Sequence, residues 1–135
     1  MILNTIQFGK LEVEEENILD FKNGLIGFEE YKRFIIVTDK EYEPILWLVS
    51  ADDPNLEFPI INPLLCYSDY DPEVVIESAE KTFFAIVSFK KQVNETTINL
   101  KAPIIVDIVN KTGEQIVLNS EKYRTDHSLL ISKEE

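Results

Sequence analysis

Short apolar segments separated by turn signals dominate this chain and constrain its fold more than any other feature. β-Branched and aromatic residues fill residues 34–38, 45–51, 82–90 and 104–109. Runs of this length and spacing are typical of antiparallel sheets. Residues 34–38 and 45–51 are almost continuously apolar, which predicts strands buried on both faces. We therefore expect a mostly β fold.

Helical signals are weak by comparison. Residues 28–33 and 121–130 could each form one turn, but neither segment has clear caps and stops. Shorter β runs at 98–100 and 115–118 follow the strongest segment, 82–90. The fold class that this pattern predicts is all-β with little helix.

The N-terminal residues predict a hairpin. Residues 2–8 alternate, which places Ile2, Ile6 and Phe8 on one face. We expect a turn at Gly9-Lys10, followed by a strand in which Leu11 and Val13 point inward.

Prolines and glycines predict the later turns. A turn at residues 52–55 precedes a stretch broken by Pro59 and Pro63, and because proline cannot donate to a ladder, we expect residues 58–63 at a sheet edge or in a loop. Residues 66–71 and 74–77 could form one irregular strand across Pro72. Residues 110–113 predict a hairpin turn in which Gly113 takes the left-handed conformation.

Length and cysteine content indicate one domain in a reducing compartment. A chain of 135 residues is long enough for a single core, so we expect one domain over residues 1–135 with a frayed tail at about 128–135. The one cysteine, Cys66, has apolar neighbours and is expected to be a small buried hydrophobe. The first ten residues lack the basic leader of a signal peptide, and the apolar runs are too short to cross a bilayer. We expect a cytoplasmic protein.

Acidic residues outnumber basic ones by 25 to 13, giving a formal net charge of -12. This charge argues against direct nucleic-acid binding and against an anionic membrane surface. Residues 1–80 hold 18 acids and 5 bases, whereas residues 81–135 hold 7 acids and 8 bases. Such asymmetry indicates a basic partner, although solubility alone would also account for it.

Sequence signals for catalysis or cofactor binding are sparse. The four glycines form no phosphate-binding loop, and one His and one Cys cannot assemble a zinc site. The pairs Asp52-Asp53 and Asp69-x-Asp71 could ligate a hard cation, but the calcium-loop pattern is absent. His127 is expected to be a solvated residue near the tail. We expect no enzyme activity, no cofactor and no metal.

Three motifs carry more specific information. FxNGLxGFxxxxxF spans residues 21–34, SxDxP…F…NP spans 50–63, and TxNLxAPI…QxVL spans 97–118. In order and spacing they resemble the FliW family of flagellar assembly factors. The opening TxxFGxLxV at residues 5–13 and the YxTxHxL at 123–129 agree, so the resemblance covers essentially the whole chain.

The resemblance implies a small antiparallel β-barrel-like domain without catalytic activity. It also implies binding of newly made flagellin in the cytoplasm. When flagellin is scarce, members of the family bind CsrA, a small basic translational repressor, and relieve the repression of flagellin mRNA. We expect the free protein to be monomeric.

These partners require two kinds of surface. Acids near turns and edges are candidates for steering a basic repressor, with plain solvation as the alternative; they are Asp52, Asp53, Glu57, Asp69, Asp71 and Glu73. Flagellin recognition calls for apolar contacts, for which Phe58 and Ile60 beside Pro59 and Pro63 are candidates, unless they simply fill the core. Trp47 is expected in the core. The alternative functions are a small acidic adaptor or anti-repressor unrelated to flagella and, third, an acidic β-domain enzyme.

Overall fold

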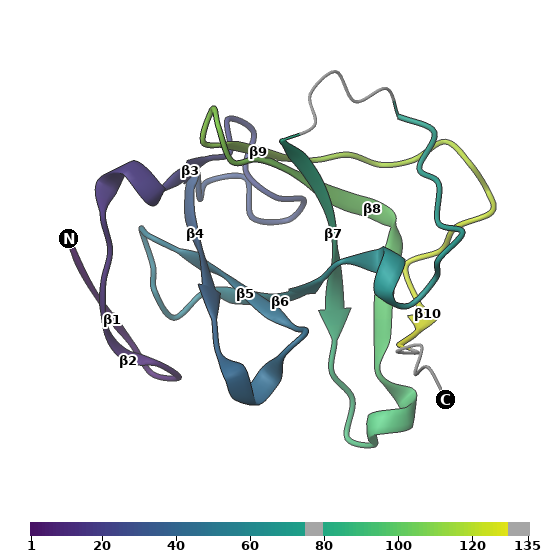
Figure 1. Cartoon of the computed structure of the whole chain (residues 1–135), viewed down its shortest axis with the longest axis horizontal. Helices are drawn as coiled ribbons and strands as arrows, with labels where there is room; N and C mark the ends of the chain where they lie inside the picture. The colour runs from purple at the N-terminus through teal and green to yellow at the C-terminus, as the bar shows by residue number, and fades with distance from the viewer. Residues whose placement is uncertain (75–79, 130–135) are drawn as a thin grey trace.

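The computed structural model describes residues 1–74 and 80–129, and within these ranges it is built from strands and 3₁₀ turns without an α-helix. This confirms the all-β prediction (Figure 1). The strands are β1 (Ile2–Thr5), β2 (Gly9–Glu12), β3 (Leu19–Asp20), β4 (Arg33–Thr38), β5 (Leu46–Ser50), β6 (Glu57–Ile61), β7 (Lys81–Ser88), β8 (Thr97–Asp107), β9 (Thr112–Gln115) and β10 (His127–Ser128). The 3₁₀ turns are η1 (Glu15–Asn17), η2 (Lys40–Tyr42), η3 (Pro63–Leu65) and η4 (Val93–Glu95).

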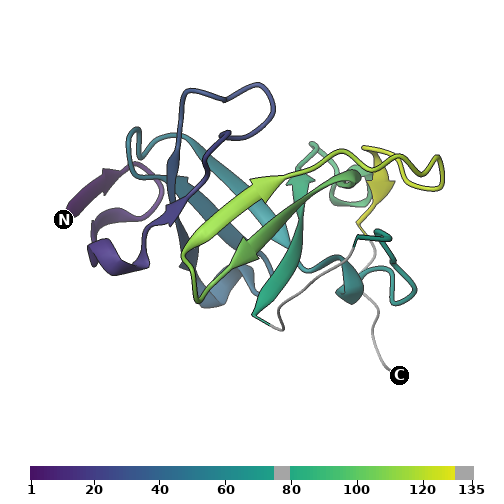
Figure 2. The same cartoon turned by 90° about the horizontal axis from the view of Figure 1, so that it is seen from above.

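Seven strands from the described part of the chain close into a barrel. Their order is β8-β7-β6-β5-β4-β3-β9, and β9 pairs again with β8. Every pairing is antiparallel except that of β3 with β9, where Asp20 lies opposite Thr112. β10 adds to β8 outside the barrel, and β1 and β2 form a separate hairpin (Figure 2). The barrel-like architecture is therefore confirmed.

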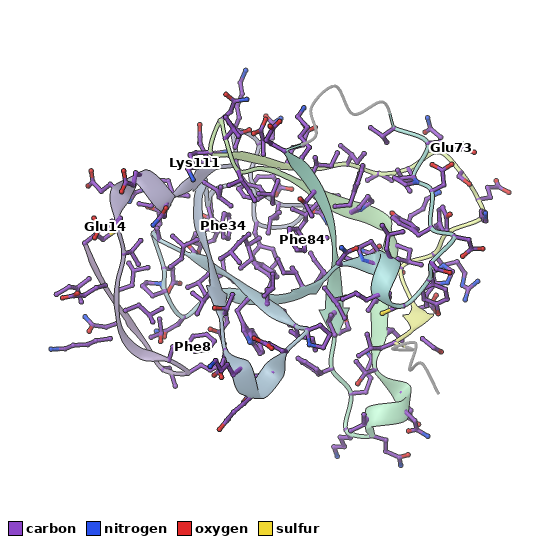
Figure 3. All side chains as sticks on the ribbon, viewed as in Figure 1. Phe8, Glu14, Phe34, Glu73, Phe84 and Lys111 are labelled. Carbon is purple, nitrogen blue, oxygen red and sulfur yellow. The ribbon has the colours of Figure 1, made fainter. Side chains whose placement is uncertain are left out.

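Two apolar clusters lie on opposite faces of the barrel wall. The inner cluster fills the barrel with side chains from β3 to β8, among them Phe34, Leu48 and Ile104; Figure 3 shows Phe34 and Phe84 between β4 and β7. The outer cluster includes Trp47 and Val49 and is covered by the β1–β2 hairpin and the C-terminal segment. Strand β5 is therefore buried on both faces, as its apolar run predicts.

The predicted β1–β2 hairpin forms, and Leu11 and Val13 pack against the outer cluster as predicted, but the face expected for β1 was wrong. Leu3 is buried, whereas Ile2 and Ile6 are 57% and 88% exposed. Thr5 is buried instead, because its Oγ1 donates to the Gly9 carbonyl at 3.0 Å and accepts from the Phe8 amide at 2.8 Å. These bonds hold a turn over residues 6–8, and Gly9 opens β2 with a φ of 67°. Thr5, which closes the turn, therefore faces inward, and the more hydrophobic Ile6 faces solvent.

The edge or loop position predicted for residues 58–63 was wrong for residues 58–61, whereas Asn62 and Pro63 leave the strand and enter η3. β6 pairs with β5 from Glu57 to Ile60 and with β7 at Ile60 and Ile61. The Ser50 amide bonds to the Leu56 carbonyl, and the alternation of antiparallel bonds then turns the nitrogen of Pro59 away from β5. On that far side β7 does not pair with Pro59. Pro59 therefore fits into β6 without the loss of a hydrogen bond to either neighbouring strand.

Other local predictions need correction. In the β8–β9 turn the left-handed residue is Lys111, with a φ of 56°, while Gly113 lies in β9 against the ring of Phe21. The runs at 98–100 and 104–109 belong mostly to one strand, β8, whose register against β7 shifts between Phe84 and Ile86. That shift accommodates Pro103 within the strand.

The remaining differences concern residues 28–33, 66–77 and the tail. Residues 28–33 form turns and then enter β4, and residues 121–129 are turns followed by β10, so neither segment is helical. Residues 66–71 form no strand, and residues 75–77 of the expected strand lie outside the described residues. Ser128 is not frayed, because it pairs with Thr97; residues 130–135 lie outside the described ranges.

Candidate partner-binding surface

The candidate acidic residues occupy two separate places. Asp52 and Asp53 lie in the β5–β6 turn, and Asp69, Asp71 and Glu73 lie in the loop that follows η3. Both views place this turn and this loop toward opposite ends of the long axis of the molecule (Figures 1 and 2). The fold therefore presents two acidic surfaces, not one.

The β5–β6 turn holds its two carboxylates in different environments. The hydroxyl of Ser50 accepts the amides of Asp52 and Asp53 at 3.1 and 3.0 Å, which fixes the start of the turn. Asp52 forms an exposed ion pair with Arg33 at 2.7 Å, and this hydrogen bond, followed by the charge of Asp52, raises the pKa of Arg33. No ion pair to Asp53 is found among residues 1–74 and 80–129. Asp53 is therefore the carboxylate of this turn that is more open to a basic partner.

Three tyrosines anchor the loop that carries Asp69, Asp71 and Glu73. The hydroxyl of Tyr70 donates to the Leu100 carbonyl at 2.9 Å, and that of Tyr67 donates to the Ser128 carbonyl at 2.7 Å. The Tyr123 hydroxyl accepts the amide of Asp71 at 2.8 Å, and the rings of Tyr70 and Tyr123 meet edge to face. The three acids are exposed on this fixed loop. Their carboxylates are thus displayed at defined positions.

His127 lies behind the same loop, not in solvent as expected. Its ring contacts those of Tyr67 and Tyr123, and its Nε2 accepts the amide of Arg124 at 2.8 Å. Burial, and then the charge of Arg124, lower the pKa of His127. A neutral imidazole therefore helps to hold the C-terminal segment against the barrel.

The apolar candidates are core residues. Ile60 is fully buried in the inner cluster, so its side chain is not available to a partner in this conformation. Phe58 is half-buried and meets Phe28 edge to face, with ring centroids 5.0 Å apart. Glu57, the preceding residue of β6, is half-buried opposite Val49 of β5, and burial raises its pKa. Of the two alternatives considered for Phe58 and Ile60, filling the core is the one that the packing favours.

Exposed apolar side chains occur instead at hairpin tips, which the sequence reasoning missed. Ile6 is 88% exposed in the β1–β2 turn, and Phe89 and Val93 are 51% and 86% exposed in the β7–β8 turn. Trp47 is buried, as expected, and the rings of Phe8, Tyr42 and Phe89 surround it. The available signal was an apolar residue at a turn position, since turns lie at the surface.

Over residues 1–74 and 80–129 no group of three or more His, Cys, Asp or Glu side chains could hold a metal ion. Cys66 is half-buried and packs against the outer cluster. Within residues 1–74 and 80–129 no helix is long and apolar enough to cross a membrane.

Known proteins similar to this chain share its fold and sequence over nearly their full length. The family model for FliW protein matches residues 2–129. The flagellar assembly factor FliW of Alkaliphilus metalliredigens is 36% identical, covering 96% of this chain and 86% of that protein. The FliW of Caldicellulosiruptor bescii is 40% identical, covering 86% and 82%.

A crystal structure of the flagellar assembly factor FliW also superimposes on this fold. Its TM-score is 0.89 at 26% sequence identity, and the match covers 99% of this chain and 100% of that one. The sequence motifs, the closed barrel and these matches agree. The chain therefore belongs to the FliW family of flagellar assembly factors.

Proposed function

We propose that this protein binds flagellin in the cytoplasm and, when flagellin is depleted, binds and antagonises the translational repressor CsrA. Binding of CsrA would relieve the repression of flagellin mRNA, so the protein would couple flagellin supply to flagellin synthesis. The observation that carries the proposal is membership of the FliW family over residues 2–129. The role is that of a regulatory binding protein and not of an enzyme.

The charge distribution supports a basic partner. Residues 1–80 supply the whole excess of the net charge of -12. Within this part, residues 1–74 form β1 to β6 and the loop that follows η3. Exposed acids at Asp53, Asp69, Asp71 and Glu73 suit the steering of a basic protein, which acts mainly on the association rate. We retain these residues and Asp52 as the proposed contacts for CsrA.

The exposed hairpin tips support an apolar partner. The tips expose the apolar side chains of Ile6, Phe89 and Val93. A partner could contact these side chains while Phe58 and Ile60 stay in the core. Flagellin segments that bury an apolar face on assembly would find complementary surface there. We therefore move the proposed flagellin contacts from Phe58 and Ile60 to these tips.

Binding kinetics with purified CsrA test the electrostatic part of the proposal. Asp53→Lys is expected to slow association several-fold while leaving the folded spectrum intact, because Asp53 lies in an exposed turn. Glu114→Lys on β9 makes the same charge change outside both acidic surfaces and serves as the control. Equal association rates for the two variants, or rates independent of salt, would exclude the β5–β6 turn as the steering surface.

A further inference from the structure

A groove of about 300 Å³ lies between β2 and β4, at one side of the β1–β2 hairpin. One wall is formed by β2 and the residues that follow it, and the other wall is formed by β4. Figure 1 shows this hairpin beside β4, outside the closed barrel. Leu11 and Val13 face Ile35 and Val37 across the groove, and all four belong to the outer apolar cluster or pack against it. The groove therefore has an apolar floor.

The β4 wall exposes an unpaired strand edge. The Phe21 amide donates to the Lys32 carbonyl at 2.7 Å, and Leu19 lies opposite Phe34. Because antiparallel bonds alternate, the peptide groups of Phe34 face β3, and those of Ile36 and Thr38 face the same edge. β3 begins at Leu19 and does not reach them. In the described part of the chain, no strand pairs with this end of the edge.

The β2 wall exposes a second unpaired edge. The Val13 amide donates to the Met1 carbonyl at 2.8 Å, and Leu11 lies opposite Leu3 in β1. By the same alternation the peptide groups of Lys10 and Glu12 face away from β1. No strand pairs with them over residues 1–74 and 80–129. Two strand edges with unpaired donors and acceptors thus border one groove.

Side chains at the rim define the chemistry of an occupant. The charged residues that line the groove are Glu12 and Glu14, both exposed, and among the residues that the structure describes no Lys or Arg lines it. A strand lying between β2 and β4 would alternate like β2, with one face toward Leu11 and Val13 and the other toward the two glutamates. Opposite charges paired across strands stabilise a sheet, and like charges destabilise it.

We propose that this groove binds an extended segment of a partner protein as an added strand, with apolar side chains on one face and Lys or Arg on the other. Backbone bonds to both edges would supply affinity, and the glutamates would select for basic side chains. A second copy of β2 would bring its own Glu12 and Glu14 into the groove and matches the charge of the rim less well than a segment with Lys or Arg only. The proposal goes beyond the function stated above, because it specifies a mode of binding that depends on neither named partner.

Amide hydrogen exchange on the full-length chain tests this proposal. The probe is an alternating Lys-Val peptide of about eight residues, capped at both ends. In the free protein the amides of Glu12, Ile36 and Thr38 are expected to exchange faster than those of Ile35 and Val37, which face β5. With the peptide at millimolar concentration, the first three amides should slow by about tenfold or more.

Two controls separate strand addition from general attraction. The matching Glu-Val peptide should leave exchange unchanged, and Glu12→Lys should reduce the protection by the Lys-Val peptide more than Glu30→Lys in the β3–β4 loop does. Unchanged exchange at Glu12, Ile36 and Thr38 with saturating Lys-Val peptide would overturn the proposal. Equal protection by the Lys-Val and Glu-Val peptides would overturn the proposed charge preference. Protection that rises with protein concentration in the absence of peptide would overturn the proposed partner segment, because a second copy of this chain would then fill the groove.

Discussion

Replacing Gly113 by alanine should destabilise the barrel through a single steric conflict. A Cβ at this position would lie 2.2 Å from Cζ and 2.4 Å from Cε1 of Phe21. The Phe21 ring is fully buried and meets Phe34 edge to face at 5.1 Å. The new methyl group therefore cannot be accommodated without displacing an aromatic ring that is itself packed.

The distances set the size of the effect. The closest approach is more than 1 Å short of the 3.4 Å at which ordinary van der Waals contact begins. Overpacking of a core costs about 1–3 kcal/mol, and a displacement this large belongs in the upper half of that range. Loss of glycine freedom in the unfolded chain offsets about 0.5 kcal/mol. We expect a net loss of about 2 kcal/mol, or about 7 °C in Tm for a domain of this size.

Thermal and urea unfolding of a double-mutant cycle provides the assay. Phe21→Leu removes the ring atoms that the methyl group meets, so Gly113→Ala should cost at most half as much in that background. The cycle also cancels the effect of alanine on the unfolded chain. A Gly113→Ala penalty that is the same in both backgrounds, or no penalty at all, would refute the proposed contact.

Three further predictions concern stability. Because the folded pKa of His127 is lowered below its usual 6.5, its neutral form stabilises the fold above that pH, and this contribution is lost as pH falls through the folded pKa. The free energy of unfolding, measured between about pH 5 and 6.5, should therefore depend less on pH in His127→Gln. An identical slope of unfolding free energy against pH in both proteins would contradict the role of the neutral ring. Tyr70→Phe removes a buried bond to the Leu100 carbonyl and should cost about 1 kcal/mol in urea unfolding, whereas the exposed Tyr42→Phe should cost little; equal losses would argue against the anchor. Arg33→Ala breaks an exposed ion pair and should cost at most about 1 kcal/mol, less in high salt; a larger, salt-independent loss would show that Arg33 acts through packing.

Much of the barrel could be predicted from local patterns. The runs that became β4, β5 and β7 are strongly apolar, and burial on both faces of β5 follows from its lack of alternation. These strands need no information from distant residues to be recognised. The three motifs likewise identified the family that the comparisons show.

The errors arose where tertiary contacts override the local pattern. Thr5 is buried because its hydroxyl closes the β1–β2 turn, and Pro59 is accepted in β6 because β7 diverges there. Gly113 is required by the ring of Phe21, which is distant in sequence, and not by the turn. The partners of Thr5 are near in sequence but give no hydrophobic signal, whereas β7 and Phe21 lie far along the chain from Pro59 and Gly113.

The candidate site was only partly predictable for the same reason. Exposure of the turn acids follows from their positions. The ion pair of Asp52 with Arg33 depends on the register of β4 against β5, and the separation of the two acidic surfaces depends on the whole fold. Ile60 illustrates the opposite case. Its proline-flanked segment was expected at an edge or in a loop, with partner contact and core filling both considered for the side chain, and that side chain is fully buried. The groove between β2 and β4 arises from pairings that end early, which no motif encodes.

A competition titration with purified CsrA, flagellin and this chain tests the central claim most directly. CsrA carries a fluorescent label, and its anisotropy reports the complex while flagellin is added. The proposed function predicts a complex with CsrA that flagellin dissociates, with association slowed by salt. Failure to form the complex, or an anisotropy that flagellin leaves unchanged, would contradict it.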